Sequence, residues 1–187
     1  MKSLIVILPR GVREFCGHPL PVWGEGGGEG KISGQGGAIH LLGNKVGLID
    51  NARIDASGAM GGGSILLGGD YQGGNANVRN AAQTYVGAGT SFLADAIQSG
   101  NGGKVIVWSD DATRYYGNIS ARGGTQSGDG GTVEVSGKGW LDFNGMVDTR
   151  ATNGANGTLL LDPTDINIVA AGTATPDTLL TGQLFED

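Results

Sequence analysis

The stretch that decides the fold runs from residue 102 to residue 135 and reads GGKVIVWSDDATRYYGNISARGGTQSGDGGTVEV. A glycine pair and one spacer precede Val105 and Val107, and the same arrangement precedes Val133 and Val135. Alternation of apolar and polar residues is typical of β-strands. Recurrence at intervals of about 20–50 residues is typical of solenoids and propellers. This stretch therefore predicts stacked, repeated strands.

The same arrangement recurs on both sides of this stretch. It starts at Gly36, Gly62, Gly102, Gly130 and Asn156, at intervals of 26, 40, 28 and 26 residues. Each repeat holds three short segments of period two, separated by Gly, Asn, Asp or Ser turns. Because the strands recur at the same offsets, they can pair from one repeat to the next. The sequence predicts an all-β parallel β-helix of about five coils over residues 31–170.

The alternation also predicts which side chains fill the core. The residues expected to face inward are Ile39, Leu41, Ile54, Ile65, Leu67, Val105, Val107, Ile119, Val133, Val135, Val147, Leu159 and Leu161. By the same rule His40, Trp108, Glu134 and Trp140 should face solvent. The glycines are expected at corners that need a positive φ. The longer second interval places an insertion at residues 68–89, which we interpret as a surface loop without a role.

Composition and charge exclude a collagen-like structure and argue against one class of partner. Of the 187 residues 38 are glycine and five are proline, without the Gly-X-Y period of collagen. Charged residues make up 16% of the chain and the net charge is −6, which argues against nucleic acid as a partner. The single cysteine, Cys16, cannot form an internal disulfide. We find no run of 18 apolar residues.

Candidate chemistry is confined to a few acidic residues. Asp55, Asp95 and Asp148 each follow a residue expected to face inward, so they should share one outward position, with Asp55 and Asp95 on adjacent coils about 5 Å apart. One interpretation is a cation site, or a paired-acid face like that of β-helical polysaccharide lyases. The interpretation that we favour is a solvated acidic row beside Arg53. We expect no catalytic residues, no cofactor and no enzymatic activity.

A set of motifs over about residues 31–170 resembles a known family. The motifs are LLGGDYQGG, KVIVWSDDATRYYG, ISARGG, GGTVEVSGK, LDFNG and GTLLLDPTDINI. They resemble the repeat region of large filamentous-haemagglutinin-like exoproteins of Gram-negative bacteria. The resemblance implies a right-handed β-helix, export by a two-partner system, and a secreted or outer-membrane location. It also implies a role in adhesion, with host-surface carbohydrate or protein as the possible partner.

The two ends of the sequence lack the repeat. Residues 1–30 match no part of the family, and we expect them to be unstructured. Their apolar run, residues 4–8, is shorter than the core of a signal peptide. Residues 171–187 are expected to begin a further coil, with a short helix near Thr175. We interpret the chain as a shaft fragment that neighbours further coils and self-associates through uncapped ends. The alternatives are a β-helical carbohydrate-active enzyme and a non-functional remnant.

Overall fold

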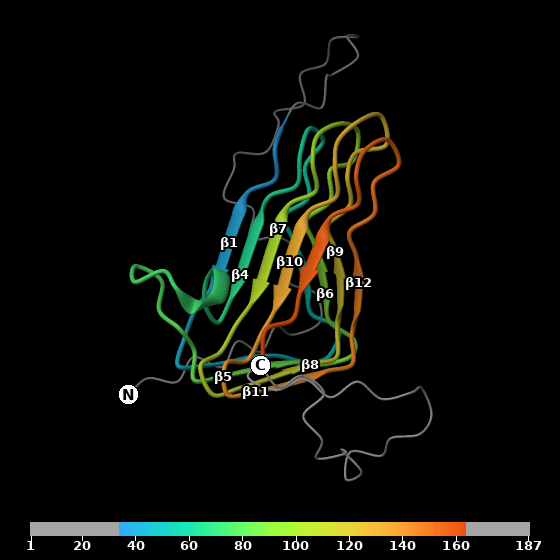
Figure 1. Ribbon diagram of the computed structural model, residues 1–187. Coiled ribbons are helices and arrows are strands. Elements are labelled where there is room, and N and C mark those ends of the chain that lie inside the picture. Colours follow the sequence, from blue (N-terminus) through green and yellow to red (C-terminus); the bar gives the residue numbers. More distant parts are fainter. Residues whose placement is uncertain (1–33, 164–187) are drawn as a thin grey trace, which may run out of the picture.

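The computed structural model describes residues 34–163, which form a parallel β-helix with three sheets (Figure 1). Sheet A contains β1 (Ala38–Leu41), β4 (Ser64–Leu67), β7 (Lys104–Val107), β10 (Thr132–Val135) and β13 (Thr158–Leu160). Sheet B contains β2 (Lys45–Leu48), β5 (Gln83–Val86), β8 (Ala112–Tyr115) and β11 (Trp140–Phe143). Sheet C contains β3 (Arg53–Asp55), β6 (Ser91–Leu93), β9 (Asn118–Ser120) and β12 (Met146–Asp148). Each of the first four coils takes one strand from each sheet in turn, and β13 begins a fifth coil, so the predicted architecture is confirmed.

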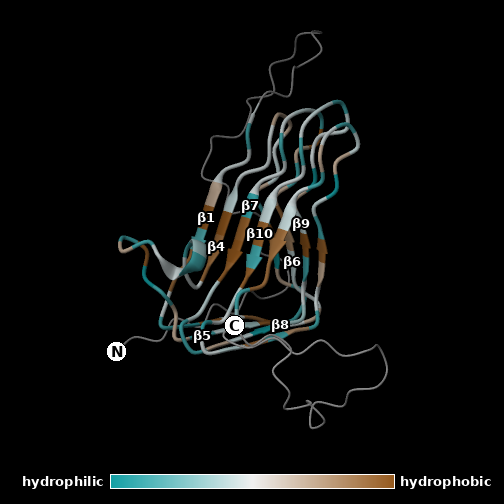
Figure 2. Cartoon of the chain, viewed as in Figure 1, coloured by the Kyte–Doolittle hydropathy of each residue, from teal (hydrophilic) through white to brown (hydrophobic). Residues whose placement is uncertain are grey.

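The register of the sheets follows the repeat. In sheet A, Ile39, Ile65, Val105, Val133 and Leu159 occupy one continuous row across all five strands. In sheet C, Ile54, Ile119 and Val147 share a row that Phe92 completes. Figure 2 shows that the apolar residues concentrate on the strands, whereas the loops beyond them are more hydrophilic. The strands therefore stack in the register that the spacing of the repeats predicts.

The core lies inside the coils. Of the residues expected there, Ile54, Ile65, Leu67, Val105, Val107, Ile119, Val133 and Val135 are buried, and Ile39, Leu41, Val147 and Leu161 pack against them. Three aromatic rings continue the core: Tyr115 lies 6.1 Å from Phe92 and 5.7 Å from Phe143, centroid to centroid. Leu159 is the exception, because its side chain is 41% exposed. It stands in β13, which pairs only with β10 among the described strands.

The glycine pairs close each coil at a narrow neck between sheets C and A. Among the described glycines a positive φ occurs at Gly61, Gly68, Gly73, Gly100 and Gly128, so the prediction of a positive φ was wrong for the pairs themselves. What these pairs require is space. A Cβ on Gly62 would clash with the carbonyl oxygen of Ala94, and Gly103 N donates to that same oxygen at 2.7 Å. Two backbones thus meet at the neck, and only glycine fits there.

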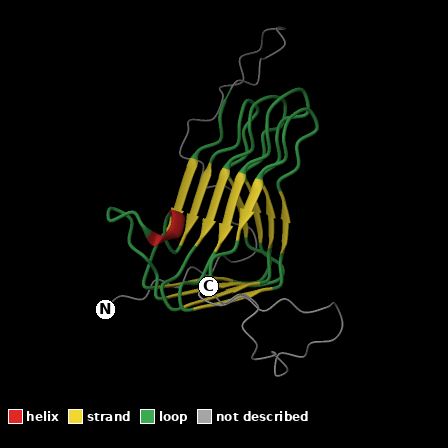
Figure 3. Cartoon of the chain, in the orientation of Figure 1, coloured by secondary structure: helices red, strands yellow, loops and turns green. Residues whose placement is uncertain are grey.

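Beyond each neck the chain makes a long excursion before it returns to sheet A, and these loops stack on one another (Figure 3). The described residues include one short 3-10 turn, η1 (Tyr71–Gly73), and no α-helix. Within residues 34–163 no helix is long and apolar enough to cross a membrane. The expectations for residues 1–30 and 171–187 lie outside the described residues.

Candidate functional site

The insertion of the second coil is the most elaborate part of the surface. It is shorter than residues 68–89, because β5 already begins at Gln83. We call residues 68–80 the strap. The strap leaves sheet A after β4, contains η1 and lies beside the outer face of this sheet (Figures 1 and 3).

The strap buries outward-facing side chains of sheet A. Leu66, Ile106 and Trp108 form a second apolar cluster outside the coils. Glu134 occupies the same outward row as Leu66 and Ile106 and is 0% exposed. Alternation predicts the outward direction correctly for Trp108 and Glu134, but the expectation that they face solvent was wrong. The strap covers them, and the alternation around these two residues does not indicate such a cover.

Two acidic side chains fasten the strap. The carboxylate of Glu134 accepts hydrogen bonds from the backbone N of Gln72 at 3.0 and 3.2 Å. Asp70 accepts from the backbone N of Tyr71 and from Asn75 Nδ2, both at 2.8 Å, and from Lys104 Nζ at 3.1 Å. Because Lys104 lies in β7 and Glu134 in β10, the strap of the second coil is held by the third and fourth coils.

The surroundings shift the pKa values of Asp70 and Glu134 in opposite directions. The hydrogen bond from Asn75, the backbone N–H of Tyr71 and the charge of Lys104 lower the pKa of Asp70 to about 2. Burial raises the pKa of Glu134, and the nearby carboxylates Asp162 and Asp70 add to the effect. The surroundings therefore stabilise the ionised form of Asp70 and disfavour the ionised form of Glu134.

A hollow of about 320 Å³ lies at the foot of the strap and is lined by Gln72, Asn80, Trp108, Asp110, Lys138 and Asp162 among others. Asp110 Oδ1 accepts from Trp108 Nε1 and from Asn80 Nδ2, both at 3.0 Å. Trp108 is only 4% exposed, so its ring offers no open platform for a ligand. The polar lining suits a small hydrophilic molecule. Among the described residues no group of three or more His, Cys, Asp or Glu side chains could hold a metal ion.

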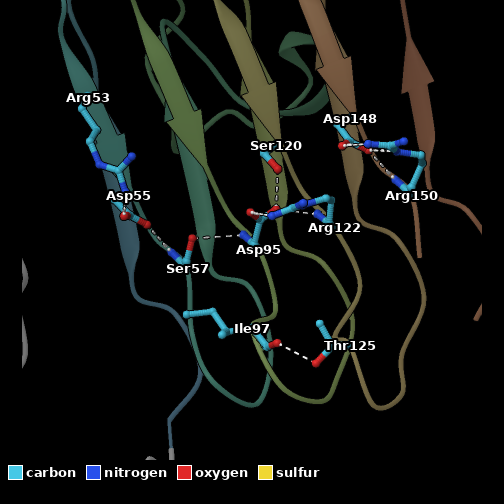
Figure 4. A network of polar contacts seen from close by, with 10 residues as sticks. All are labelled: Arg53, Asp55, Ser57, Asp95, Ile97, Ser120, Arg122, Thr125, Asp148 and Arg150. Atoms are coloured by element: carbon cyan, nitrogen blue, oxygen red, sulfur yellow. Dashed lines mark hydrogen bonds and ion pairs between the residues drawn. The ribbon is translucent and has the colours of Figure 1, made fainter. Parts of the chain in front are cut away.

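The acidic row predicted on sheet C differs from its expected arrangement. Asp55 shares its row with Leu93, Ser120 and Asp148. Asp95 lies two residues beyond Leu93, so the proposed pairing of Asp55 with Asp95 was wrong. The insertion had obscured the register of β6. Asp95 Oδ1 instead accepts from Ser120 Oγ and from the backbone N of Arg122, both at 2.7 Å (Figure 4).

Each of these carboxylates is paired with an arginine (Figure 4). The N–O distances are 2.5 Å for Arg53 with Asp55, 3.3 Å for Arg122 with Asp95 and 2.7 Å for Arg150 with Asp148. The hydrogen bonds from Arg150 lower the pKa of Asp148 to about 2. Since all three acids already have cationic partners, they are better described as parts of a polar surface network, in which Asp95 links neighbouring coils, than as a cation site.

The other two side chains predicted to face solvent do so. His40 is exposed at the outer face of β1, and Trp140 is 42% exposed on sheet B.

The sequence did contain one sign of the strap. The runs Ile65–Leu67 and Val105–Val107 are apolar at three consecutive positions, which is typical of strands buried on both faces.

No protein-family model matches the chain, and no curated protein matches it. Among solved structures, the crystal structure of the HMW1 secretion domain from Haemophilus influenzae matches with 36% identity and a TM-score of 0.55. The match covers 68% of this chain and 32% of that one, so this chain spans about a third of the length of that domain. In sequence and in fold, the chain is similar to part of the HMW1 secretion domain.

Proposed function

We propose that the chain is a structural segment of an exported adhesin, with a β-helical shaft of the filamentous-haemagglutinin type carried out by a two-partner system. The observation that carries this proposal is the 36% identity to a secretion domain over 68% of the chain, together with the parallel coils. Host-surface carbohydrate or protein is the partner class that such a role implies.

The physical character of the fold supports a structural role. The first four coils bond to one another along three parallel sheets, β13 of the fifth coil continues sheet A, and continuous apolar rows fill the interior. Solenoids of this kind extend by adding coils, because each repeat contacts only its neighbours. The outward positions are then available for recognition without disturbing the core.

The proposal is tested in the bacterial cells that produce the protein. Intact cells are treated with protease, fractionated and probed with an antibody against residues 34–163. We expect the protein in the medium or at the surface, where protease removes it, and fewer attached cells after deletion of the gene. Retention of the protein inside the cells, or adherence equal to that of the parent strain, would contradict the proposal.

A β-helical carbohydrate-active enzyme is the second candidate, and the hollow lined by Asp110 and Asp162 favours it. We expect no cleavage, because Asp110 already accepts bonds from Trp108 and Asn80, which hold its carboxylate in a structural role. Purified protein is incubated with polygalacturonate and related polymers, and new reducing or unsaturated ends are measured. Release that disappears in the Asp110→Asn and Asp162→Asn variants would favour the enzyme.

A further inference from the structure

The outer face of sheet B carries a cluster of aromatic and cationic side chains. We call Ile49, Tyr85, Arg114, Tyr116 and Trp140 the aromatic face. Tyr85 and Arg114 are direct neighbours across β5 and β8, and Trp140 lies in β11 next to Ala112. Ile49 is 36% exposed and Tyr85 41% exposed, and Arg114 is also exposed. Sheet B, with the residues that directly follow β2 and β8, thus presents these side chains on one face.

Contacts within the cluster fix the side chains in place. The guanidinium carbon of Arg114 lies 5.0 Å from the centroid of the Trp140 ring. Tyr85 packs edge to face against Tyr116 at 5.9 Å, and the Tyr116 hydroxyl donates to Asp142 Oδ2 at 2.5 Å. A Cβ on Gly47, the sheet neighbour of Tyr85, would meet no atom within 4 Å. The surface is therefore ordered before binding, with open space beside Tyr85.

Arg114 differs from Arg53, Arg122 and Arg150 in having no carboxylate partner among residues 34–163. Arg53, Arg122 and Arg150 each pair with an aspartate, whereas Arg114 forms no ion pair among residues 34–163. Its neighbour across the strands is Asp142, but that carboxylate is bonded to Tyr116. The hydrogen bond to Asp142, together with burial, raises the pKa of Tyr116 to about 12, so this arrangement persists at neutral pH. The N–H groups of Arg114 remain available to a carboxylate from outside.

The composition of the face indicates the class of partner. Tyr, Trp and Arg are the residues enriched in the centres of protein interfaces. Arg114 already covers one face of the Trp140 ring and Tyr116 contacts the Tyr85 ring, which leaves less of either ring for stacking on a sugar. We propose that the aromatic face binds an acidic segment of a partner protein. A carboxylate of that segment pairs with Arg114, and its apolar side chains pack on Ile49 and Tyr85.

The test uses the full chain and a fluorescent copolymer of glutamate and tyrosine as the probe. The net charge of −6 repels such a probe, so binding requires a local cationic site. We expect saturable binding that weakens with salt. Arg114→Gln should weaken it at least about tenfold, the loss typical of an interface hot spot, and Tyr85→Ala should also weaken it. Both side chains are exposed, so thermal unfolding should stay unchanged.

Arg79→Gln is the matched control, because it removes the same charge from an exposed arginine of the strap. We expect a change of less than about twofold for this variant. Three results would overturn the proposal: no binding of the copolymer, an equal loss in the Arg79 and Arg114 variants, or equally tight, Arg114-dependent binding of polygalacturonate. The last result would assign the face to acidic sugars instead of protein.

Discussion

Val133 and Glu134 are adjacent in β10 and both are fully buried, for different reasons. Val133 faces the interior in the row that joins Val105 and Leu159. Glu134 faces the opposite way and lies beneath the strap, where Gln72 donates to it. At the scale of the residue, the period of two thus determines which face of the sheet a side chain occupies. The strap then determines whether a side chain on the outer face is exposed.

Val133→Asp should be strongly destabilising, because it places a charge without a partner between two coils. An uncompensated buried charge costs several kcal/mol, about 3 kcal/mol or more. Thr132→Asp is the control, since Thr132 is exposed and its sheet neighbour Lys104 is cationic. Thermal unfolding followed by circular dichroism should show a large loss for Val133→Asp and little change for Thr132→Asp. Equal losses would mean that the inward row is assigned incorrectly.

Glu134→Gln should make stability less dependent on pH. Burial raises the pKa of Glu134, so the folded state binds its proton more tightly than the unfolded chain does. The contribution of this group is therefore complete below about pH 4 and is lost as pH rises through the folded pKa. Glutamine keeps an acceptor for Gln72 without the charge. The variant should be more stable than the wild-type chain near neutral pH, and the difference should vanish in acid.

The control is Asp111→Asn, which removes a charge from an exposed residue. Melting temperatures are compared from about pH 4 to about pH 8. If the difference between Glu134→Gln and the wild-type chain were constant across this range, the charge of Glu134 would not be the cause.

At the scale of the element, the strands were predictable, whereas the apolar runs in β4 and β7 indicated a cover on sheet A but not the path of the strap. The strands repeat at fixed offsets, so Tyr115 and Phe143, like Ile119 and Val147, could be aligned from sequence alone, and each pair is in register. The strap has no period, and its bond from Gln72 to Glu134 joins positions 62 residues apart. The same insertion shifted the apparent register of Asp95. Local pattern therefore determines which residues pair in a sheet, whereas a loop is placed by distant contacts.

Gly73→Val should detach the strap. Gly73 has a φ of +60°, which favours glycine, and a Cβ there would lie 2.6 Å from Cε2 of Trp108. Gly74→Ala is the matched control, because its φ is −84° and the nearest atom to its Cβ would be 3.6 Å away. Trypsin should cut at Arg79 in the strap faster in Gly73→Val, as measured by mass spectrometry. Unchanged cleavage would show that contact with Trp108 does not hold the strap.

At the scale of the whole molecule, the coils are joined by backbone pairing and by side chains that cross between them. Ser57, Asp95 and Ser120 belong to three successive coils, and Asp95 bonds to both of the others (Figure 4). The described stack ends at β1 on one side and at β13 on the other, and each has a single neighbour in sheet A. The same pairing that builds the stack can therefore extend it.

Self-association through these outer strands is the prediction at this scale. An outer strand offers unpaired N–H and C=O groups to another chain, and Leu159 of β13 adds an apolar side chain that is 41% exposed. In sedimentation, the weight-average mass of the purified protein should rise with concentration. Leu159→Lys should reduce this association, because a charged residue at an edge opposes pairing. Ile97→Lys is the control, since Ile97 is 58% exposed but lies in a loop outside the strands. A monomer at every concentration would show that other parts of the chain cover β1 and β13.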